Sequence, residues 1–310
     1  MDWQNCKLIS ISLNEHKVYV IENKAGTIVG KFAYPQTMLP TSLSLSENKQ
    51  KACLTLKQEN HGAICILNFD KMQSYQLPIE IPSPIQFAIT PDFKKAYFVS
   101  NDSTLYFLDT SSLTLTPLAQ SQDTTCAGIV VEDEKIYTIW ESGKEGILTV
   151  FSLDGTIIYE DKFSGIPTNI CLKGSEIMIT FTESDQYGEG VIFASENNPP
   201  IYLSVQFLHT PYTPHIYPCS ITLNKQKDTA YIIHEDGGAI SIVDTVNHII
   251  QKTFSIGRSI TNIHLLPDER FAIATSNMFA DLSLLDLINF KLIAISDSKQ
   301  EFSNILSILP

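Results

Sequence analysis

The stretch CSITLNKQKDTAYIIHEDGGAISIVDTVNHIIQKTFSIG, from Cys219 to Gly257, decides the fold. It contains four short runs, rich in Ile, Val, Tyr and Thr, in which apolar and polar residues alternate. Because successive side chains of a strand point to opposite faces, this period of two predicts four β-strands separated by turns. Nowhere in the chain does an amphipathic helical pattern persist over three turns, so we expect no substantial helix.

The first strand of this unit recurs along the whole chain. Seven segments align without gaps, at spacings of 44, 42, 41, 51, 42 and 42 residues: PTSLSLS (from Pro40), PIQFAIT (Pro84), CAGIVVE (Cys126), PTNICLK (Pro167), PCSITLN (Pro218), ITNIHLL (Ile260) and FSNILSI (Phe302). Units of four strands repeated at this period are typical of β-propellers. We therefore predict an all-β chain, a seven-bladed β-propeller of four-stranded antiparallel blades, forming a single domain over residues 1–310.

The two ends of the chain predict how the ring is closed. The segment FSNILSI is an inner strand with nothing after it, whereas the N-terminal segments CKLISIS, KVYVIE and TIVGKFAY match second, third and fourth strands without a first. The C-terminal strand is therefore expected to pair within the first blade, which would leave no exposed sheet edges.

At these residues the sequence resembles a known family. The segments TAYIIHEDGGAISIVDTVNHIIQKTFSIG and KKAYFVSNDSTLYFLDTSSLTL are similar to the repeats of the YVTN-repeat β-propeller family, whose members are WD-like or lactonase-like propellers. No unit keeps the literal tetrapeptide, and Trp140 or His234 stands where the family has a small residue. The resemblance implies the fold; because the family includes binding proteins and enzymes, it implies no single activity.

Composition excludes several partner classes. The chain has 21 Lys and Arg against 34 Asp and Glu, a net charge of −13, with no basic block, so we expect no nucleic-acid partner. There is no signal-peptide pattern and no apolar run long enough to span a bilayer, so we expect a cytoplasmic protein with no membrane partner. No nucleotide-cofactor motif is present. We expect a monomer or a weak dimer.

The six cysteines are scattered without a C-x-x-C pair. This spacing favours reduced, buried thiols over a zinc site or a disulfide framework. Cys53 and Cys65 could face each other across a hairpin, but the more favoured interpretation is that both are small core residues.

Candidate functional residues gather in one predicted sector. In propellers, ligand sites usually lie on the upper face, which carries the loops between successive blades and between second and third strands. There the stretch HTPYTPHIYP (residues 209–218) interrupts the repeat between the fifth and sixth blades, next to unusual residues at the tips of the second strands. We predict a catalytic group of His234, Glu235, Glu141 and Glu183, and ligand-binding residues Trp140, His209, Tyr212, His215, Tyr217, Arg258, Asn169, Asn262 and Asn304.

Each of these residues has a structural alternative. The inner-strand asparagines belong to a polar column that would either form a collar at the channel entrance or bond neighbouring blades together. His234 would either act as a base or bond a loop carbonyl, and the glutamates would either select a ligand or be solvated. His209 and His215 would either line a pocket or form a rigid turn packed on Tyr217.

Two functional hypotheses follow. In the first, the chain is a non-catalytic scaffold that binds a protein, a peptide or a small molecule on its upper face, with aromatic anchors and with carboxylates that select a cationic partner. In the second, a His/Glu pair at the channel mouth, with or without a divalent metal, gives a lactonase or lyase. No catalytic signature such as G-x-S-x-G or H-E-x-x-H is present. The sequence leaves the choice between enzyme and scaffold open.

Overall fold

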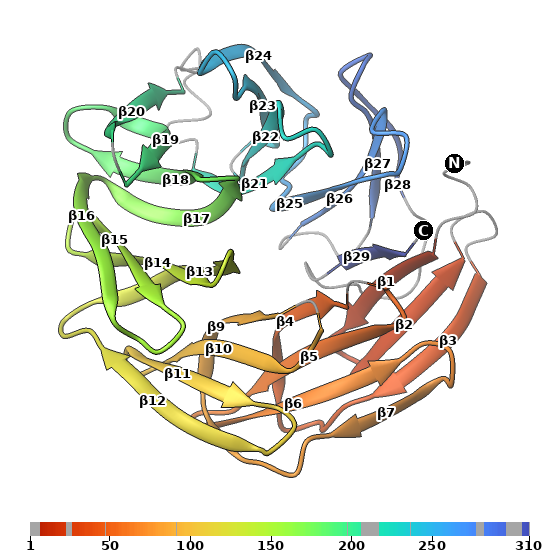
Figure 1. Cartoon of the computed structure of the whole chain (residues 1–310). Coiled ribbons are helices and arrows are strands. Elements are labelled where there is room, and N and C mark those ends of the chain that lie inside the picture. The colour runs from red at the N-terminus through yellow and green to blue at the C-terminus, as the bar shows by residue number, and fades with distance from the viewer. Residues whose placement is uncertain are drawn as a thin grey trace. The chain divides into compact units, whose positions relative to one another are not determined.

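The computed structural model describes residues 7–22, 27–46, 48–90, 92–196, 198–205, 217–235, 237–276, 282–295 and 306–309 (Figure 1). Every regular element in these ranges is a β-strand. The described residues therefore contain no helix with the length and apolar character needed to cross a membrane.

The chain falls into two compact units. The N-terminal unit comprises Gln4–Trp140, Thr149–Glu160 and Ile305–Pro310, and the C-terminal unit comprises Met1–Trp3, Glu141–Leu148 and Asp161–Asn304. The expected single domain over residues 1–310 remains a prediction.

The N-terminal unit holds three antiparallel sheets among its described residues. The first has the order β29 (Leu306–Leu309), β1 (Lys7–Ser12), β2 (Lys17–Glu22) and β3 (Thr27–Ala33). The second has the order β4 (Leu39–Leu45), β5 (Lys51–Lys57), β6 (His61–Asn68) and β7 (Gln73–Gln76), and β8 (Ile81–Pro82) also pairs with β6. The third is formed by β9 (Pro84–Ile89), β10 (Lys95–Ser100), β11 (Thr104–Asp109) and β12 (Thr114–Gln120).

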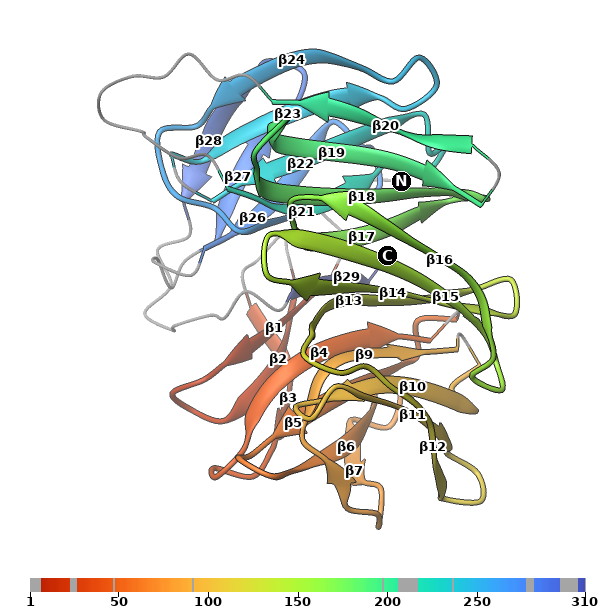
Figure 2. The same cartoon turned by 90° about the vertical axis from the view of Figure 1, so that its left-hand side faces the viewer.

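The C-terminal unit also holds three sheets among its described residues. The fifth sheet is β17 (Ile166–Lys173), β18 (Glu176–Ser184), β19 (Gly188–Ser195) and β20 (Asn198–Ser204), and these strands follow one another in Figure 2. The sixth is β21 (Pro218–Leu223), β22 (Thr229–His234), β23 (Ala239–Asp244) and β24 (Ile249–Ser255). The seventh is β25 (Asn262–Leu265), β26 (Phe271–Thr275), β27 (Ser283–Asp286) and β28 (Lys291–Ile295).

The fourth sheet takes residues from both units. It has the order β13 (Thr125–Glu132), β14 (Lys135–Ser142), β15 (Glu145–Ser152) and β16 (Ile157–Ser164). Over the described ranges there are thus seven antiparallel sheets, and apart from β29 their strands follow chain order. The predicted fold class, a seven-bladed β-propeller with four-stranded blades, is confirmed.

The middle strands of a blade are buried on both faces. In β5, Cys53 packs into the apolar core between the second and third blades, and the next residue, Leu54, packs into the core between the first and second. Both side chains are fully buried. By contrast, all four residues of the outer strand β7 are exposed. Because alternate side chains serve two different cores, the middle strands are apolar almost throughout.

A carboxylate at the end of the third strand fixes the turn to the fourth in several blades. Asp109, Asp244 and Asp286 each accept hydrogen bonds from the backbone N–H groups of the residues two and three positions later, at 2.8 to 3.0 Å. These bonds favour the charged form, and the N–H of Asn289 contributes most to lowering the pKa of Asp286 to about 2. Asp109 and Asp244 belong to the segments that carry the family resemblance.

None of the five described cysteines is joined in a disulfide. Cys53, Cys65 and Cys126 are buried, whereas Cys171 and Cys219 are half-buried. Burial raises the pKa of Cys65 to about 11, which keeps this thiol protonated at neutral pH. The prediction of reduced, buried thiols is confirmed for Cys53, Cys65 and Cys126; Cys6 lies outside the described ranges.

The C-terminal strand completes the first blade. In the antiparallel register of β1 and β29, Lys7 pairs with Leu309 and Ser10 with Leu306 (Figure 1). The predicted pairing of FSNILSI with CKLISIS is therefore confirmed within the N-terminal unit. Without β29, the N–H and C=O groups on one edge of β1 would lose their partners.

Deleting residues 306–310 should therefore destabilise the N-terminal unit. Four residue pairs are lost, and at about 1 kcal/mol for each backbone hydrogen bond the free energy of unfolding should fall by roughly 3 to 5 kcal/mol. Urea unfolding followed by circular dichroism measures this change, with deletion of Pro310 alone as the control. An unchanged midpoint in the longer deletion would show that β29 is dispensable.

Candidate functional site

His234 is a fully buried residue at the end of β22. Its Nε2 lies 2.9 Å from Ser241 Oγ on β23, and Ser241 Oγ lies 2.8 Å from Thr253 Oγ1 on β24. Burial lowers the pKa of this imidazole to about 3, so the ring is neutral at pH 7. These contacts form a polar bridge across three strands of one blade, and they favour a structural role over the predicted catalytic one.

Other predicted residues of the sixth blade contribute backbone contacts. The N–H of Glu235 donates to the carbonyl of Tyr217 at 3.0 Å, and Ser259 Oγ donates to the carbonyl of Glu235 at 3.0 Å. A Cβ on Gly238 would lie 1.5 Å from the carbonyl oxygen of Arg258, so only glycine fits this approach. Glu235, Tyr217 and Arg258 are half-buried. His209, Tyr212 and His215 lie outside the described residues, so their role remains a prediction.

Trp140 of the N-terminal unit is a core residue rather than a surface anchor. Its side chain is only 2% exposed, and its Nε1 donates to Thr138 Oγ1 at 2.8 Å. A ring with so little exposed surface offers a partner almost no contact area. The remaining catalytic candidates, Glu141 and Glu183, are half-buried and exposed respectively.

The polar column of the inner strands joins neighbouring blades in the C-terminal unit. Ser220 Oγ on β21 donates to Asn262 Oδ1 on β25 at 2.9 Å. Two residues further along β21, Thr222 Oγ1 donates to the carbonyl of Ile263 at 3.0 Å. Of the two interpretations left open by the sequence, these contacts support blade-to-blade bonding. Asn169 is half-buried, and Asn304 lies outside the described residues.

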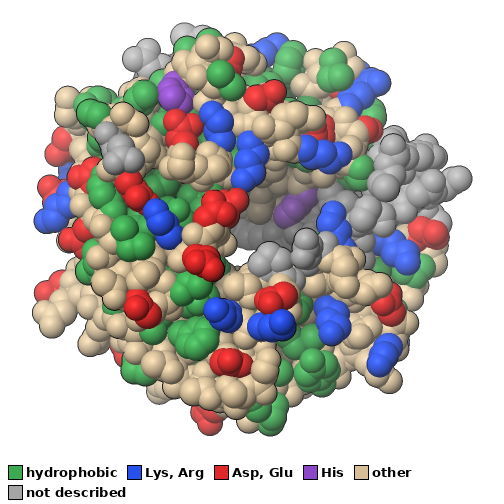
Figure 3. Space-filling model, viewed as in Figure 1, with side chains coloured by type: hydrophobic (Ala, Val, Ile, Leu, Met, Phe, Trp, Pro, Cys, Tyr) green, Lys and Arg blue, Asp and Glu red, His purple; other side chains and the backbone are tan. Residues whose placement is uncertain are grey.

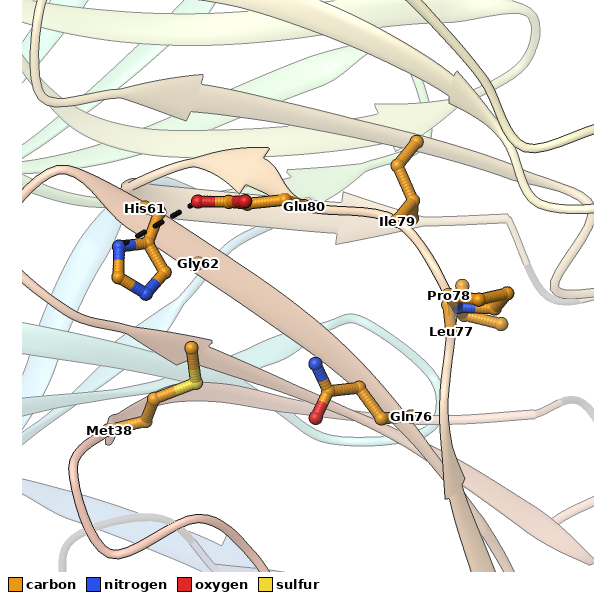
Figure 4. A pocket seen from close by; sticks show the side chains of 8 residues that line it. All are labelled: Met38, His61, Gly62, Gln76, Leu77, Pro78, Ile79 and Glu80. Atoms are coloured by element: carbon orange, nitrogen blue, oxygen red, sulfur yellow. Dashed lines mark ion pairs between the residues drawn. The ribbon is translucent and has the colours of Figure 1, made fainter.

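A cavity of about 360 Å³ opens at the upper end of the second blade, by which we mean the end with the turn between its second and third strands. Figure 4 shows this cavity, which we call the blade-two pocket. Its lining consists of Met38, His61, Gly62, Gln76, Leu77, Pro78, Ile79 and Glu80. None of these residues is among those predicted from the sequence.

The pocket lies beside QLPIEIPSP (residues 76–84), a segment with three prolines. Proline has no backbone N–H and cannot donate to a β-ladder. The outer strand β7 ends at Gln76, after four residues and two positions before Pro78. Its counterpart β12 in the third blade keeps seven residues and includes Pro117, which lies beside a register shift. The chain bends away through Leu77 to Glu80 and returns as β8, where Ile81 pairs with Gly62. The bend leaves the cavity between the outer edge of the blade and the connection to the next blade.

Gly62 permits the close approach of this connection. A Cβ at this position would lie 2.4 Å from Pro84 Cδ and 2.7 Å from the carbonyl oxygen of Leu56, and neither atom belongs to a flexible chain end. The missing side chain thus lets Pro84 pack directly over the start of β6 and fixes one wall of the pocket.

A histidine and a carboxylate face each other across the pocket. His61 Nδ1 lies 3.9 Å from Glu80 Oε1, and Figure 4 shows the two side chains pointing toward one another. Their side chains are 38% and 76% exposed, so both are open to solvent. Met38 and Leu77, which supply apolar surface, are buried.

The third blade has a cavity at the equivalent place. It has a volume of about 520 Å³ and lies between the turn after β10 and the connection after β12. Its lining is entirely polar: Asn101, Asp102, Ser103, Gln120, Ser121, Gln122, Asp123, Thr124 and Thr125. Asn101 Nδ2 also donates to the carbonyl of Glu59 in the second blade at 3.2 Å, which ties the two upper ends together.

Charge is mixed on the face that Figure 3 draws. There, Lys and Arg side chains lie among Asp and Glu side chains, without a continuous patch of either sign. Among the described residues, no group of three or more His, Cys, Asp or Glu side chains is placed to hold a metal ion.

The buried His234 predicts an acid-sensitive contribution to stability. The unfolded chain takes up this proton near pH 6.5, whereas the folded chain binds it only near pH 3. Stability is thus highest above pH 6.5 and falls as the pH drops toward 3, by about 2 kcal/mol between pH 7 and pH 5. The variant His234→Gln keeps a hydrogen-bonding partner for Ser241 but has no imidazole. Between pH 7 and pH 5 its free energy of unfolding, measured with urea, should fall by about 2 kcal/mol less than that of the control His61→Gln, whose side chain is solvent-accessible. Equal pH dependence in the two variants would mean that the folded protein protonates His234 as readily as the unfolded chain does.

Comparison with known proteins extends the fold assignment but gives no family. No family model matches the sequence, and no curated protein matches it. Among solved structures, a Lactobacillus plantarum protein is similar over 99% of this chain and 100% of its own, with a TM-score of 0.74 and 15% identity. A periplasmic gluconolactonase from Pseudomonas aeruginosa is similar over 98% and 99%, with a TM-score of 0.73 and 11% identity. At these identities the likeness shows the seven-bladed β-propeller fold alone, and the YVTN-repeat assignment remains a prediction.

Proposed function

We propose that this protein is a binding scaffold that holds its ligand at the upper ends of the second and third blades. One observation carries the proposal: two successive blades each have a cavity at the upper end. In the second blade the cavity is lined by the start of β6 and the connection after β7, and in the third by the turn after β10 and the connection after β12. Their volumes, about 360 and 520 Å³, lie in the range that small-molecule sites occupy.

The backbone around these cavities is held in place before any ligand binds. In the third blade, the N–H of Ser121 donates to the carbonyl of Ser103 at 3.1 Å, and Thr124 Oγ1 donates to Ser121 Oγ at 2.7 Å. In the second blade, the N–H of Leu77 donates to the carbonyl of Ile64 at 2.8 Å. A preorganised site binds without a large ordering cost, which favours recognition.

The binding proposal predicts that filling the blade-two pocket abolishes ligand binding. Gln76→Trp places a bulky ring at the pocket, whereas Gln73→Trp places the same ring at the other end of the equally exposed β7. Protein labelled with ¹³C at its methionine methyl groups is titrated with alkylamines, sugars, sugar lactones and short peptides. We expect at least one class to shift the Met38 signal in the wild type and in Gln73→Trp, but not in Gln76→Trp.

The outcome that would contradict this proposal is equally specific. If no class shifts the Met38 signal, or if Gln76→Trp binds as tightly as the wild type, the ligand does not lie in the blade-two pocket.

A second candidate function, lactone hydrolysis, is favoured by the His61 and Glu80 pair. A neutral imidazole can take a proton from a water molecule as that water attacks a lactone carbonyl, and a neighbouring carboxylate can orient the ring. The 3.9 Å between His61 Nδ1 and Glu80 Oε1 exceeds a hydrogen bond, so the free protein does not hold the ring in this way. The likeness to a gluconolactonase adds only a choice of substrate to test.

Turnover of D-glucono-1,5-lactone separates the two functions. Under the binding proposal, pH-stat measurements should give the same rate with and without protein at pH 6.5. If the protein instead accelerates hydrolysis, and His61→Ala and Glu80→Gln each lower kcat at least tenfold, the enzyme is the correct assignment. The matched control is Asp70→Asn, an exposed carboxylate in the turn at the opposite end of the same blade.

A further inference from the structure

We propose that the blade-two pocket takes a primary ammonium group on an unbranched aliphatic chain, the chemistry of a lysine side chain or of a free alkylamine. This inference rests on the proposed binding function, because it names the class of ligand for the same pocket. Three features of the pocket carry it: the spacing of two acceptors, the apolar surface beside them and the balance of nearby charge.

The two acceptors stand at a distance that one ammonium can bridge. His61 Nδ1 and Glu80 Oε1 are 3.9 Å apart, too far for a direct hydrogen bond. An ammonium nitrogen placed between them at about 2.8 Å from each would satisfy both with two of its three N–H donors. An alcohol, with one O–H donor, can satisfy only one of them. The geometry therefore selects a donor group with several protons.

The pocket also offers surface for an aliphatic stem. Figure 4 shows Met38 on the side of the cavity below the His61 ring, with Leu77 and Pro78 at its far end. Met38 and Leu77 are only 8% and 6% exposed, so each adds little apolar area to the lining. The more accessible apolar surface is that of Pro78 and Ile79, which are exposed and half-buried. Each buried methylene of a ligand would contribute about 0.8 kcal/mol. The thioether of Met38 can adapt to stems of different shape.

Charge near the pocket favours a cation over an anion. Glu80 is the carboxylate in the lining, and its 76% exposure makes it available to a ligand. The net charge of −13 adds a long-range attraction for cations. Lys57, which pairs with Gly62 in the ladder, is a basic residue beside the pocket and opposes a cation. An anionic ligand would be repelled by Glu80 and attracted by Lys57. Removing the charge of Lys57 should therefore strengthen the binding of a cation and weaken the binding of an anion.

A set of isosteric probes tests the class of ligand. Methionine-methyl-labelled protein at 50 mM salt is titrated with butylammonium, 1-butanol and butyrate, and the Met38 signal is assigned with Met38→Leu. We expect butylammonium to bind at least tenfold more tightly than butanol, and butyrate to give no shift. Equal binding of butanol and butylammonium, or preferential binding of butyrate, would overturn the inference.

Charge variants localise the effect. Glu80→Gln should weaken butylammonium binding at least tenfold, and Lys57→Gln should strengthen it about two- to fivefold. Asp70→Asn changes the net charge by the same amount as Glu80→Gln, at the other end of the blade, and should change the affinity less than twofold. If Glu80→Gln and Asp70→Asn weaken binding equally, the attraction is that of the whole protein and the pocket is not an ammonium site.

A second comparison distinguishes the two sources of this chemistry. The peptide acetyl-Gly-Lys-Gly-amide and its Nε-acetyl-lysine counterpart are titrated beside butylammonium. Tighter binding of the lysyl peptide than of butylammonium, lost on Nε-acetylation, indicates a lysine side chain, whereas binding of butylammonium alone indicates a free amine. If neither amine binds but a sugar or lactone shifts the Met38 signal, the ammonium inference fails while the binding function stands. If no compound shifts it, both fail.

Discussion

The burial of each blade on both of its faces is the constraint on which the rest of this structure depends. Neighbouring residues such as Cys53 and Leu54 pack into different apolar cores, one on either side of the second blade. The same holds in the C-terminal unit, where Ile232 packs against the fifth blade and Ile233 against the seventh. A polar side chain in a middle strand therefore has no route to solvent and must find its partner within the protein. Only the strand ends, the outer strands and the connections are free to vary.

This constraint explains how much could be predicted from the sequence. The strands and their repeat were predictable because both faces of every blade need the same apolar pattern. The pairing of β29 with β1 followed from counting strands in the first and last units. Individual side chains were harder to predict. His234 and Trp140 are unusual for their positions, which suggested function, but His234 has a hydroxyl partner one strand away and Trp140 has one on its own strand. The sequence does not show which neighbours a strand-end side chain will meet.

The sequence contains a feature that marks the blade-two pocket, but the strand periodicity does not detect it. Of the three prolines of residues 76–84, Pro78 falls in the connection after β7, Pro82 in β8 and Pro84 at the start of β9. Strand starts and the edge of a sheet are places where a proline breaks little pairing. The longer interruption at HTPYTPHIYP drew attention by its length and its aromatic content. Among the described residues, the candidate site lies instead at the shorter interruption. Here β7 ends after four residues, beside Gly62, whose missing side chain lets Pro84 approach β6.

The two cavities differ in chemistry although they occupy the same position in their blades. The third blade keeps a full outer strand, and its cavity is bounded by turn residues that are polar because turns require Asn, Asp and Ser. In the second blade the outer strand ends earlier, and the chain leaves β6 after Leu77, whose N–H still donates to the carbonyl of Ile64; Leu77, Pro78 and Ile79 then line the cavity. Of these two blades, the one with the shorter outer strand has the cavity with apolar lining. In a fold whose cores lie between blades, a shortened outer strand is a direct way to bring apolar and charged groups together in one open site.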